Sequence, residues 1–222
     1  MKPALIRRHG DSAPPGLLTE WLEERGMPYE ISESWRGNGQ PDARGYAFIA
    51  SLGSHHNPRD THEPAVVAEL ELLRTAVEHD VPVLGLCYGG QALAAVLGGE
   101  IIRTERPELG WVEIESDDPD FVPAGPWLEW HYDRFTTPPG ATEIARNAHS
   151  TQAFVQGPHL GVQFHPESTI EIVTGWARKD APKLHELGIH DGETRLAVPE
   201  ERKSAARAAA FRLFDAFAAR RR

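Results

Sequence analysis

The sequence predicts an α/β fold in which an open, doubly wound and mainly parallel sheet is flanked by helices and followed by a helical C-terminal extension. Three observations support this prediction. Apolar runs of strand length alternate with segments of helical periodicity through the first hundred residues, an order typical of a parallel sheet with crossover helices. A long Ala-rich segment follows from about residue 199. With 222 residues, the chain is long enough to bury a sizeable core.

The first three elements are predicted to be a strand, a helix and a strand. Residues 4–8 are mostly apolar and short enough for one strand. Residues 17–22 have helical spacing, with an apolar side made of Leu17, Leu18, Trp21 and Leu22. Gly26 is a suitable residue to end this helix. Residues 28–33 predict the second strand, and the Gly- and Pro-containing segment 34–45 predicts a loop.

The next four elements continue the alternation. Residues 46–52 predict a buried strand, and residues 63–79 predict a long helix because apolar side chains recur every three or four positions. The apolar run 83–86 predicts another buried strand, and the Ala- and Leu-rich segment 91–97 predicts the helix that follows it. Ligands of open parallel sheets bind beyond the carboxyl ends of the strands. We therefore expect a site near residues 53 and 87.

The second half of the chain predicts strands first and helices afterwards. Residues 100–104 and 111–115 alternate between apolar and polar side chains, as half-exposed strands do. Residues 141–145 and 153–156 predict further strands, and the segment from 161 to 165 leads out of the last one.

The C-terminal part predicts two helices joined by a loop. Residues 170–177 have amphipathic spacing, and residues 188–199 predict the loop. Residues 199–222 predict a long helix whose apolar stripe is Ala206, Ala210, Leu213, Phe214 and Phe217. We expect this stripe to dock on the chain's own domain rather than on a partner. The predicted organisation is a main domain over residues 1–175 and a helical extension over residues 176–222 that packs on it.

A nucleophile elbow is predicted between the strand 83–86 and the helix 91–97. Cys87, the single cysteine of the chain, is bracketed by Gly85 and Gly89. Small residues at these two positions let the chain turn sharply from strand to helix and expose the nucleophile above the sheet. The N-terminus of the helix favours the thiolate over the thiol. This context favours a catalytic cysteine over a buried structural one.

A general base is predicted at His165, which is followed by Pro166 and Glu167. Side chains two residues apart in an extended segment point the same way, about 7 Å apart along the strand. A carboxylate at Glu167 can then accept a hydrogen bond from one ring nitrogen of His165, and the other nitrogen can take the thiol proton. Cys87, His165 and Glu167 together predict nucleophilic catalysis by a triad.

These motifs resemble those of class I (triad) glutamine amidotransferases. That family has a G-x-C-x-G-x-Q elbow and a distant H-P-E, which match residues 85–91 and 165–167. The broad similarity is to the amidotransferase portion of guanylate (GMP) synthetases and to free-standing relatives. The resemblance implies a flavodoxin-like fold, with the catalytic domain over residues 1–175. It also implies a hairpin over residues 100–115.

The resemblance further implies how the site works. Cys87 attacks the side-chain amide of glutamine and forms a glutamyl thioester, while the backbone N–H groups of Gly53 and Tyr88 stabilise the oxyanion. Gln91 matches the family position that contacts the substrate. Many relatives have two glycines before a proline at the first oxyanion position, whereas this chain has a Ser after Gly53. Ammonia is expected to pass to a partner synthetase or to an acceptor substrate at the same site.

Residues 128–135 contain a third segment of interest. Family members place an aromatic residue or Ser before H-x-D here, beside the glutamine pocket, so Trp130, His131 and Tyr132 are candidate substrate contacts. An equally acceptable interpretation is structural, with His131 and Asp133 pairing across a turn.

No metal or other cofactor is predicted. His55, His56 and His62 lie in one polar loop, but they have no companion cysteine and no regular ligand spacing. A solvated loop is therefore the better interpretation than a zinc site.

The composition limits the classes of partner that the protein is expected to bind. The net charge is −10, which argues against nucleic acid, because phosphate binding needs concentrated Lys and Arg. One cysteine forms no internal disulfide, and the sequence has neither a signal-peptide pattern nor an 18-residue apolar run. We expect a cytoplasmic protein without a membrane partner. An alternative function is a γ-glutamyl hydrolase or peptidase that uses the same triad on a glutamyl conjugate.

Overall fold

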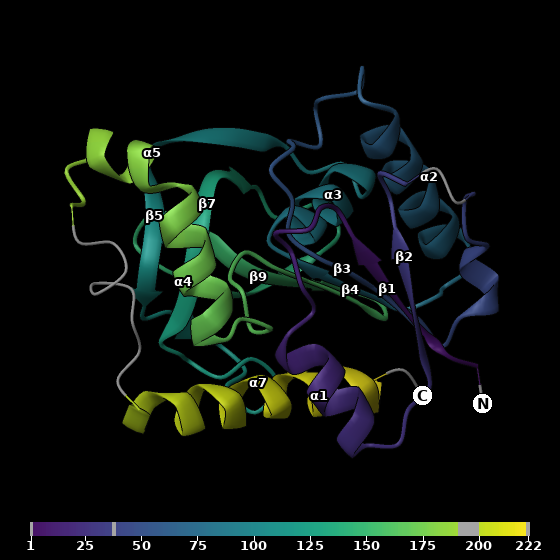
Figure 1. Cartoon of the computed structure of the whole chain (residues 1–222). Helices are drawn as coiled ribbons and strands as arrows, with labels where there is room; N and C mark the ends of the chain where they lie inside the picture. The colour runs from purple at the N-terminus through teal and green to yellow at the C-terminus, as the bar shows by residue number, and fades with distance from the viewer. Residues whose placement is uncertain (1, 37–38, 191–199, 221–222) are drawn as a thin grey trace.

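The computed structural model describes residues 2–36, 39–190 and 200–220. Across these residues, the central sheet has eight strands in the order β2-β1-β3-β4-β10-β9-β8-β6 (Figure 1). Its members are β1 (Ala4–Arg8), β2 (Tyr29–Glu33), β3 (Phe48–Ser51), β4 (Val83–Leu86), β6 (Glu115–Ser116), β8 (Thr142–Arg146), β9 (Thr151–Gln156) and β10 (His159–Val162). The first five in spatial order are parallel, and the last three continue the sheet in antiparallel pairs. The predicted mainly parallel, doubly wound sheet is confirmed.

Helices cover both faces of this sheet. The described helices are α1 (Leu17–Glu24), α2 (Pro64–Glu78), α3 (Tyr88–Val96), α4 (Ile170–Lys179), α5 (Ala181–Glu186) and α7 (Glu200–Arg220), with a short 3-10 turn at Ala43–Gly45. Helices α1 and α7 lie along one face, and α2 and α3 lie on the other (Figure 1). The bounds of the predicted helices differ from the observed ones by a few residues, most at α3, which begins directly after Cys87, and α5 was not predicted.

The alternation of side chains along the parallel strands builds the two halves of the core. In β1, Ala4 and Ile6 belong to the apolar cluster that contains α1 and α7. Leu5, between them, belongs to the cluster that contains α2 and α3. Successive side chains of a strand point to opposite faces, so a strand that is apolar throughout is buried on both sides.

The C-terminal helix α7 packs on α1 and on the sheet. Of its predicted stripe, Ala210, Leu213, Phe214 and Phe217 are buried, whereas Ala206 is half-buried. The ring of Phe214 lies 5.5 Å from that of Trp21, and the ring of Phe217 lies 5.5 Å from that of Phe48. These contacts make α7 part of the main core. The division of the chain at residue 175 stays a prediction.

A second, two-stranded sheet corrects the predicted hairpin. Residues 101–112 form one continuous strand, β5 (Ile101–Val112), which pairs antiparallel with β7 (Trp127–Phe135) and not with itself. The register shifts between Arg103 and Glu108. Pro107 lies in this interval and has no N–H to donate to the ladder. The two alternating segments are therefore the two ends of one bulged strand.

The segment between α5 and α7 is described only at its start. The predicted loop 188–199 lies mostly outside the described residues, because the description stops at residue 190 and resumes at residue 200. Among the helices that are described, none combines the length and the apolar character needed to cross a membrane.

Candidate active site

Cys87 lies at a sharp turn between β4 and α3. Its backbone has φ 52° and ψ −107°, which is the left-handed region that residues other than glycine rarely adopt. The Cys87 N–H donates to the carbonyl oxygen of Val162 in β10 at 2.9 Å, and the Gly89 N–H donates to that of Leu52 at 3.2 Å. The neighbouring strands on both sides therefore hold the turn. This geometry is that of the predicted nucleophile elbow.

The glycines of the elbow are required by close packing. A Cβ at Gly89 would collide with the backbone carbonyl of Ser51 in β3, and one at Gly90 would collide with the carbonyl of Val162 in β10. A Cβ at Gly85 would lie 2.5 Å from the carbonyl oxygen of Gly89. The start of α3 is thus wedged between two strands, a position that only residues without a side chain can fill.

His165 and Glu167 form a buried pair beside Cys87. The Nδ1 of His165 lies 2.8 Å from Oε1 of Glu167, and the two residues are 5% and 3% exposed. They lie in a turn after β10, which ends at Val162, so the expected extended geometry is wrong. The turn brings the two side chains into direct contact. The His165 N–H donates to the carbonyl oxygen of Leu128 in β7 at 2.9 Å, which fixes the turn.

The electrostatics of His165 favour its charged form. Burial disfavours the imidazolium, but the negative charges of Cys87 and Glu167 outweigh this effect, so the pKa of His165 is raised well above its usual value. A thiolate and an imidazolium side by side are the reactive state of a cysteine nucleophile.

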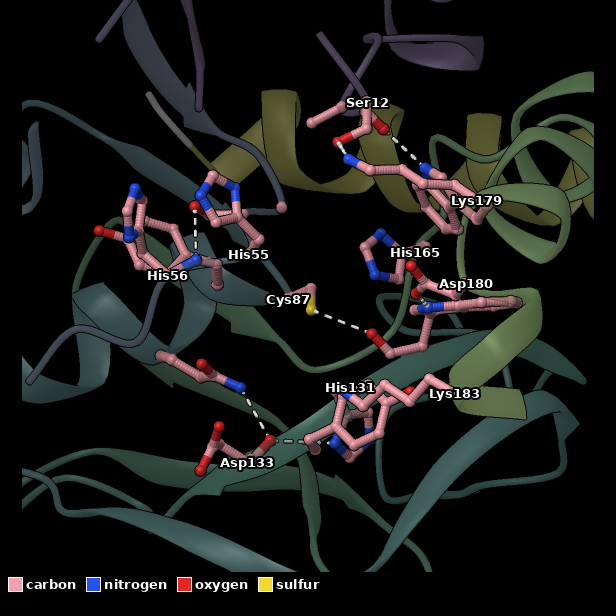
Figure 2. A pocket seen from close by; sticks show the side chains of 18 of the residues that line it. Ser12, His55, His56, Cys87, His131, Asp133, His165, Lys179, Asp180 and Lys183 are labelled. Atoms are coloured by element: carbon pink, nitrogen blue, oxygen red, sulfur yellow. Dashed lines mark hydrogen bonds between the residues drawn. The ribbon is translucent and has the colours of Figure 1, made fainter. Parts of the chain in front are cut away.

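A cavity of about 260 Å³ opens above Cys87 (Figure 2). The predicted site residues that line it are Gly53, Cys87, Tyr88, Gln91, Trp130, His131, Tyr132 and His165. Of the predicted site residues, Glu167 alone is absent from the lining, because it contacts the Nδ1 of His165.

The two predicted oxyanion residues meet in this cavity. Gly53 follows β3, and a Cβ on it would lie 3.0 Å from Cε1 of His165, so the backbone passes close to the imidazole ring. Tyr88 begins α3, and its own ring packs edge-on against His9 with 4.8 Å between centroids. The Tyr88 ring is therefore directed away from Cys87, and the part of Tyr88 that faces the cavity beside Cys87 is its backbone.

Gln163 is a contact of the nucleophile that sequence reasoning missed. Its side chain is fully buried, and its Nε2 lies 3.9 Å from Sγ of Cys87. Its Oε1 lies 3.5 Å from Nε2 of Gln91, which also donates to the carbonyl oxygen of Asp133 at 2.8 Å. Two glutamine side chains thus link the nucleophile to β7. The available signal was a polar residue in the otherwise apolar run before His165.

His131 is a buried cation under the cavity. Its Nδ1 donates to the carbonyl oxygen of Asp133 at 3.0 Å, within the same strand. Its Nε2 lies 3.2 Å from Glu108 and 3.1 Å from Glu129. Burial lowers the pKa of His131, but the two carboxylates more than offset this effect and raise the pKa to about 10. The alternative in which the His131 and Asp133 side chains pair across a turn is wrong. His131 contacts the backbone carbonyl of Asp133 within β7, and its charged partners are Glu108 and Glu129.

Trp130 and Tyr132 connect the cavity to α4 and α5. The Trp130 indole N–H donates to Oδ2 of Asp180 at 3.1 Å, and its ring lies 5.7 Å from that of Trp176. Trp176 also packs edge-on against His165 at 4.8 Å. The Tyr132 ring carries Lys183 over one side, with Nζ 3.4 Å from its centroid. Trp176 and Asp180, like Lys179 and Lys183, were not predicted as site residues.

A comparison with known families decides the affiliation of the chain. The family model for class I glutamine amidotransferases matches residues 53–173, more than half of the sequence. The chain belongs to this family.

Relatives of this amidotransferase include GMP synthases. It is 37% identical over 164 residues to the glutamine-hydrolysing GMP synthase of Aeropyrum pernix, an alignment that covers 68% of this chain and 30% of that protein. It is 37% identical over 117 residues to one subunit of the glutamine-hydrolysing GMP synthase of Sulfurisphaera tokodaii, covering 46% of this chain and 62% of that relative. The amidotransferase thus spans less than two thirds of either relative.

A solved structure matches the amidotransferase over nearly its whole length. The glutamine amidotransferase of Methylobacillus flagellatus superposes with a TM-score of 0.87 at 27% identity, covering 98% of this chain and 94% of that chain. The flavodoxin-like fold predicted from the resemblance is confirmed. The end of α4 and all of α5 lie beyond the residues that the family model matches.

The histidine loop contributes to the rim of the cavity. The rings of His55 and His56 lie 4.1 Å apart and both line the cavity, whereas His62 lies outside it, 3.5 Å from Glu63. Within the described ranges 2–36, 39–190 and 200–220, no group of three or more His, Cys, Asp or Glu side chains has a metal-binding arrangement.

Proposed function

We propose that this amidotransferase hydrolyses the side-chain amide of glutamine through a thioester on Cys87 and delivers the ammonia to an acceptor or partner synthetase. One observation carries the proposal: a strained cysteine at an elbow shares a cavity with a histidine that is held by a buried carboxylate. Family membership supports the choice of an amide as substrate.

In the first half of the reaction, the Cys87 thiolate attacks the amide carbon of glutamine. The carbonyl oxygen becomes an oxyanion, which the N–H groups of Gly53 and Tyr88 stabilise. The C–N bond then breaks, and the imidazolium of His165 gives its proton to the departing nitrogen, so that ammonia leaves and a glutamyl thioester remains.

In the second half, water attacks the thioester. His165, now neutral, takes a proton from this water, and the C–S bond breaks to release glutamate and the thiolate. Glu167 holds His165 in one orientation and stabilises its charged form through the contact to Nδ1. We assign Gln91, Trp130, His131 and Tyr132 to the wall that receives the glutamine.

The acceptor of the ammonia is the part of the proposal that rests on relatives. Ammonia released into water is diluted, so it can be used in a synthesis only where an acceptor is near. The relatives named above are GMP synthases, and one of them is a single subunit of such an enzyme. A synthetase partner is therefore proposed for this chain, and its substrate is left open.

The test is covalent labelling by an electrophilic glutamine analogue, read as intact mass. We expect one adduct on the wild type and none on Cys87→Ala, because the chain has no other cysteine. Glutamate release from glutamine is measured in parallel, and Glu167→Gln should lower it by about a hundredfold, within the usual range for acid–base catalysis. An unlabelled wild type whose Cys87 still reacts with an unselective thiol reagent would contradict the proposal.

A further inference from the structure

The carboxylate of Glu167 has little besides His165 to hold it. Its Oε1 lies 2.8 Å from Nδ1 of His165. Within the described part of the chain, its Oε2 is buried and has no hydrogen-bond partner, which is unusual for a buried polar atom. A carboxylate with one partner does not fix its own position. The backbone that carries Glu167 must therefore set where its side chain lies.

The connection between β1 and α1 holds this backbone. The Leu17 N–H, at the start of α1, donates to the carbonyl oxygen of Glu167 at 2.9 Å. Gly16 lies directly against the same carbonyl. It has a φ of 45°, and a Cβ on it would collide with that oxygen and lie 2.8 Å from Cδ1 of Ile172. Both the backbone conformation and the lack of space require glycine at this position.

The same connection also reaches His165, through Trp176. The Trp176 indole N–H donates to the carbonyl oxygen of Ser12 at 2.6 Å. The Trp176 ring packs edge-on against the His165 ring, with 4.8 Å between centroids. Ser12 and His165 both line the cavity (Figure 2), whereas Gly16 is not among its lining residues. Residues 10–17 therefore contact Glu167 directly and His165 through one intervening ring.

This connection is fixed at both of its ends. At its start, the Arg8 guanidinium donates to the carbonyl oxygens of Gly10 at 3.4 Å and Ala13 at 3.2 Å. At its end, the Gly16 carbonyl oxygen accepts from the backbone N–H of Thr19 at 3.1 Å and from its hydroxyl at 2.8 Å. Helix α1, which follows, buries its apolar side in the core. A segment held in this way can impose a position on its neighbours.

We propose that Gly16 and Trp176 are positioning residues for the His165–Glu167 pair. The inference rests on the proposed function, in which Glu167 holds His165 for proton transfer. Gly16 lets α1 come close enough to bond the Glu167 backbone, and Trp176 holds the His165 ring in place. They lie on either side of residues 53–173, which the family model matches. Because both act through their neighbours, replacing them should change proton transfer more than glutamine binding.

The expected consequence is a change in the charge of His165. The charged groups that act on it are Cys87, Glu167 and Glu129 of β7. Of these, Gly16 contacts Glu167. Burial opposes the imidazolium, but the negative charges of Cys87 and Glu167 outweigh this effect and raise the pKa of His165. Displacing Glu167 lowers that pKa, so fewer molecules hold the thiolate–imidazolium pair at neutral pH.

The first measurement is the rate at which iodoacetamide alkylates Cys87 as a function of pH, read as intact mass. We expect the half-maximal rate of Gly16→Ala to move to higher pH by about half a unit or more, because an opposite charge in full contact shifts a pKa by about 1–3 units. Glu167→Gln should move it in the same direction. Gly26→Ala is the matched control, since Gly26 follows the same helix with a φ of 60° but has open space around it. It should leave the profile unchanged.

A second variant, Trp176→Phe, keeps a ring on His165 and removes the N–H that bonds Ser12. It should shift the profile in the same direction by a smaller amount, and it decides the case if circular dichroism shows that Gly16→Ala does not fold. In glutamine hydrolysis, Gly16→Ala should lower kcat by about tenfold and leave KM within about twofold, since a displacement of about 1 Å can cost about a hundredfold in rate.

Alkylation by iodoacetamide separates failure of the positioning role from failure of the proposed function, because it needs no recognition of a glutamyl group. If the wild type neither hydrolyses glutamine nor reacts with an electrophilic glutamine analogue, but the profile shifts as expected, the positioning role stands and the proposed function fails. If folded Gly16→Ala keeps the wild-type profile, or if Gly26→Ala shifts it as far, the positioning role is overturned, whatever the result with glutamine.

Discussion

At the scale of single residues, the nucleophile depends on a strained backbone that its neighbours impose. Cys87 adopts a positive φ of 52°, which costs a non-glycine residue on the order of 1 kcal/mol or more. Hydrogen bonds to β10 and to the residue after β3 hold this conformation, and the glycines beside it allow those strands to approach. The strain places the thiol in the cavity instead of in the core.

We predict that Gly89→Ala lowers the free energy of unfolding by about 1–3 kcal/mol, the usual cost of overpacking. The added methyl group would meet the carbonyl of Ser51, a backbone atom that cannot rotate away. Urea unfolding measures the change, and labelling of Cys87 should slow as well. Gly175→Ala is the control: Gly175 is exposed within α4 and has open space around it, so this change should be neutral or stabilising. Equal effects at both positions would contradict the explanation.

The three residues proposed as a triad could be picked out from the sequence because their signals are local. The glycines beside Cys87 and the spacing of His165 and Glu167 are visible in short stretches of sequence. Gln163 and Lys183 were missed for a physical reason: their contacts in the cavity are with Cys87 and Tyr132, which are distant in sequence. A single sequence contains no measure of such distances.

At the scale of elements, the pair β5 and β7 supplies one wall of the cavity. β7 carries Glu129 and His131 on one side, and β5 brings Glu108 to the same histidine. The hairpin prediction failed here because strand pairing is decided by tertiary contacts, whereas alternation in the sequence shows only that a segment is a strand. The prediction that these segments are strands was right, and the prediction that they pair with each other was wrong.

We predict that the Glu108–His131–Glu129 cluster makes the free energy of unfolding fall as the pH rises into the alkaline range. The pKa of His131 is raised from 6.5 to about 10 in the folded state, so its stabilisation is complete below pH 6.5 and is lost as the pH rises through about 10. His131→Gln should cost about 3 kcal/mol at pH 6, since it leaves buried carboxylates unpaired, and the deficit should shrink toward pH 10.

The measurement for this cluster is the free energy of unfolding in urea at pH 6, 8 and 10. His62→Gln serves as the control, because the His62 side chain is 77% exposed, and it should change stability by less than about 0.5 kcal/mol. A His131→Gln variant with the same pH slope as the wild type would show that His131 is not the titrating group.

At the scale of the whole molecule, the C-terminal helix α7 completes the core. It covers the face of the sheet that α1 leaves open, and Asp215 on it accepts hydrogen bonds from Trp21 and Arg25 in the N-terminal part of the chain. The apolar stripe predicted a buried helix face. Its location beside α1 followed only from the structure, since several uncovered faces were available to it.

We predict that Phe214→Ala destabilises the whole fold by about 3–5 kcal/mol, the usual cost of emptying a buried aromatic site. Phe214 is fully buried and lies against Trp21. Thermal unfolding followed by far-ultraviolet circular dichroism should show one transition at lower temperature. The control Arg212→Ala changes an exposed position of the same helix and should leave the midpoint nearly unchanged. Two separate transitions in the Phe214 variant would indicate that α7 unfolds independently of the sheet.

The single thiol of this chain also allows the active sites in a sample to be counted by titration. Cys87 is the only cysteine among the 222 residues, and it lies at the base of the cavity with 6% of its surface exposed. Any stoichiometric thiol reagent small enough to enter therefore reports the fraction of competent molecules in a preparation. Intact sites react at the rate of the native cavity and damaged ones at the rate of the denatured chain, so the amplitudes of the two phases separate the two populations without any engineered probe.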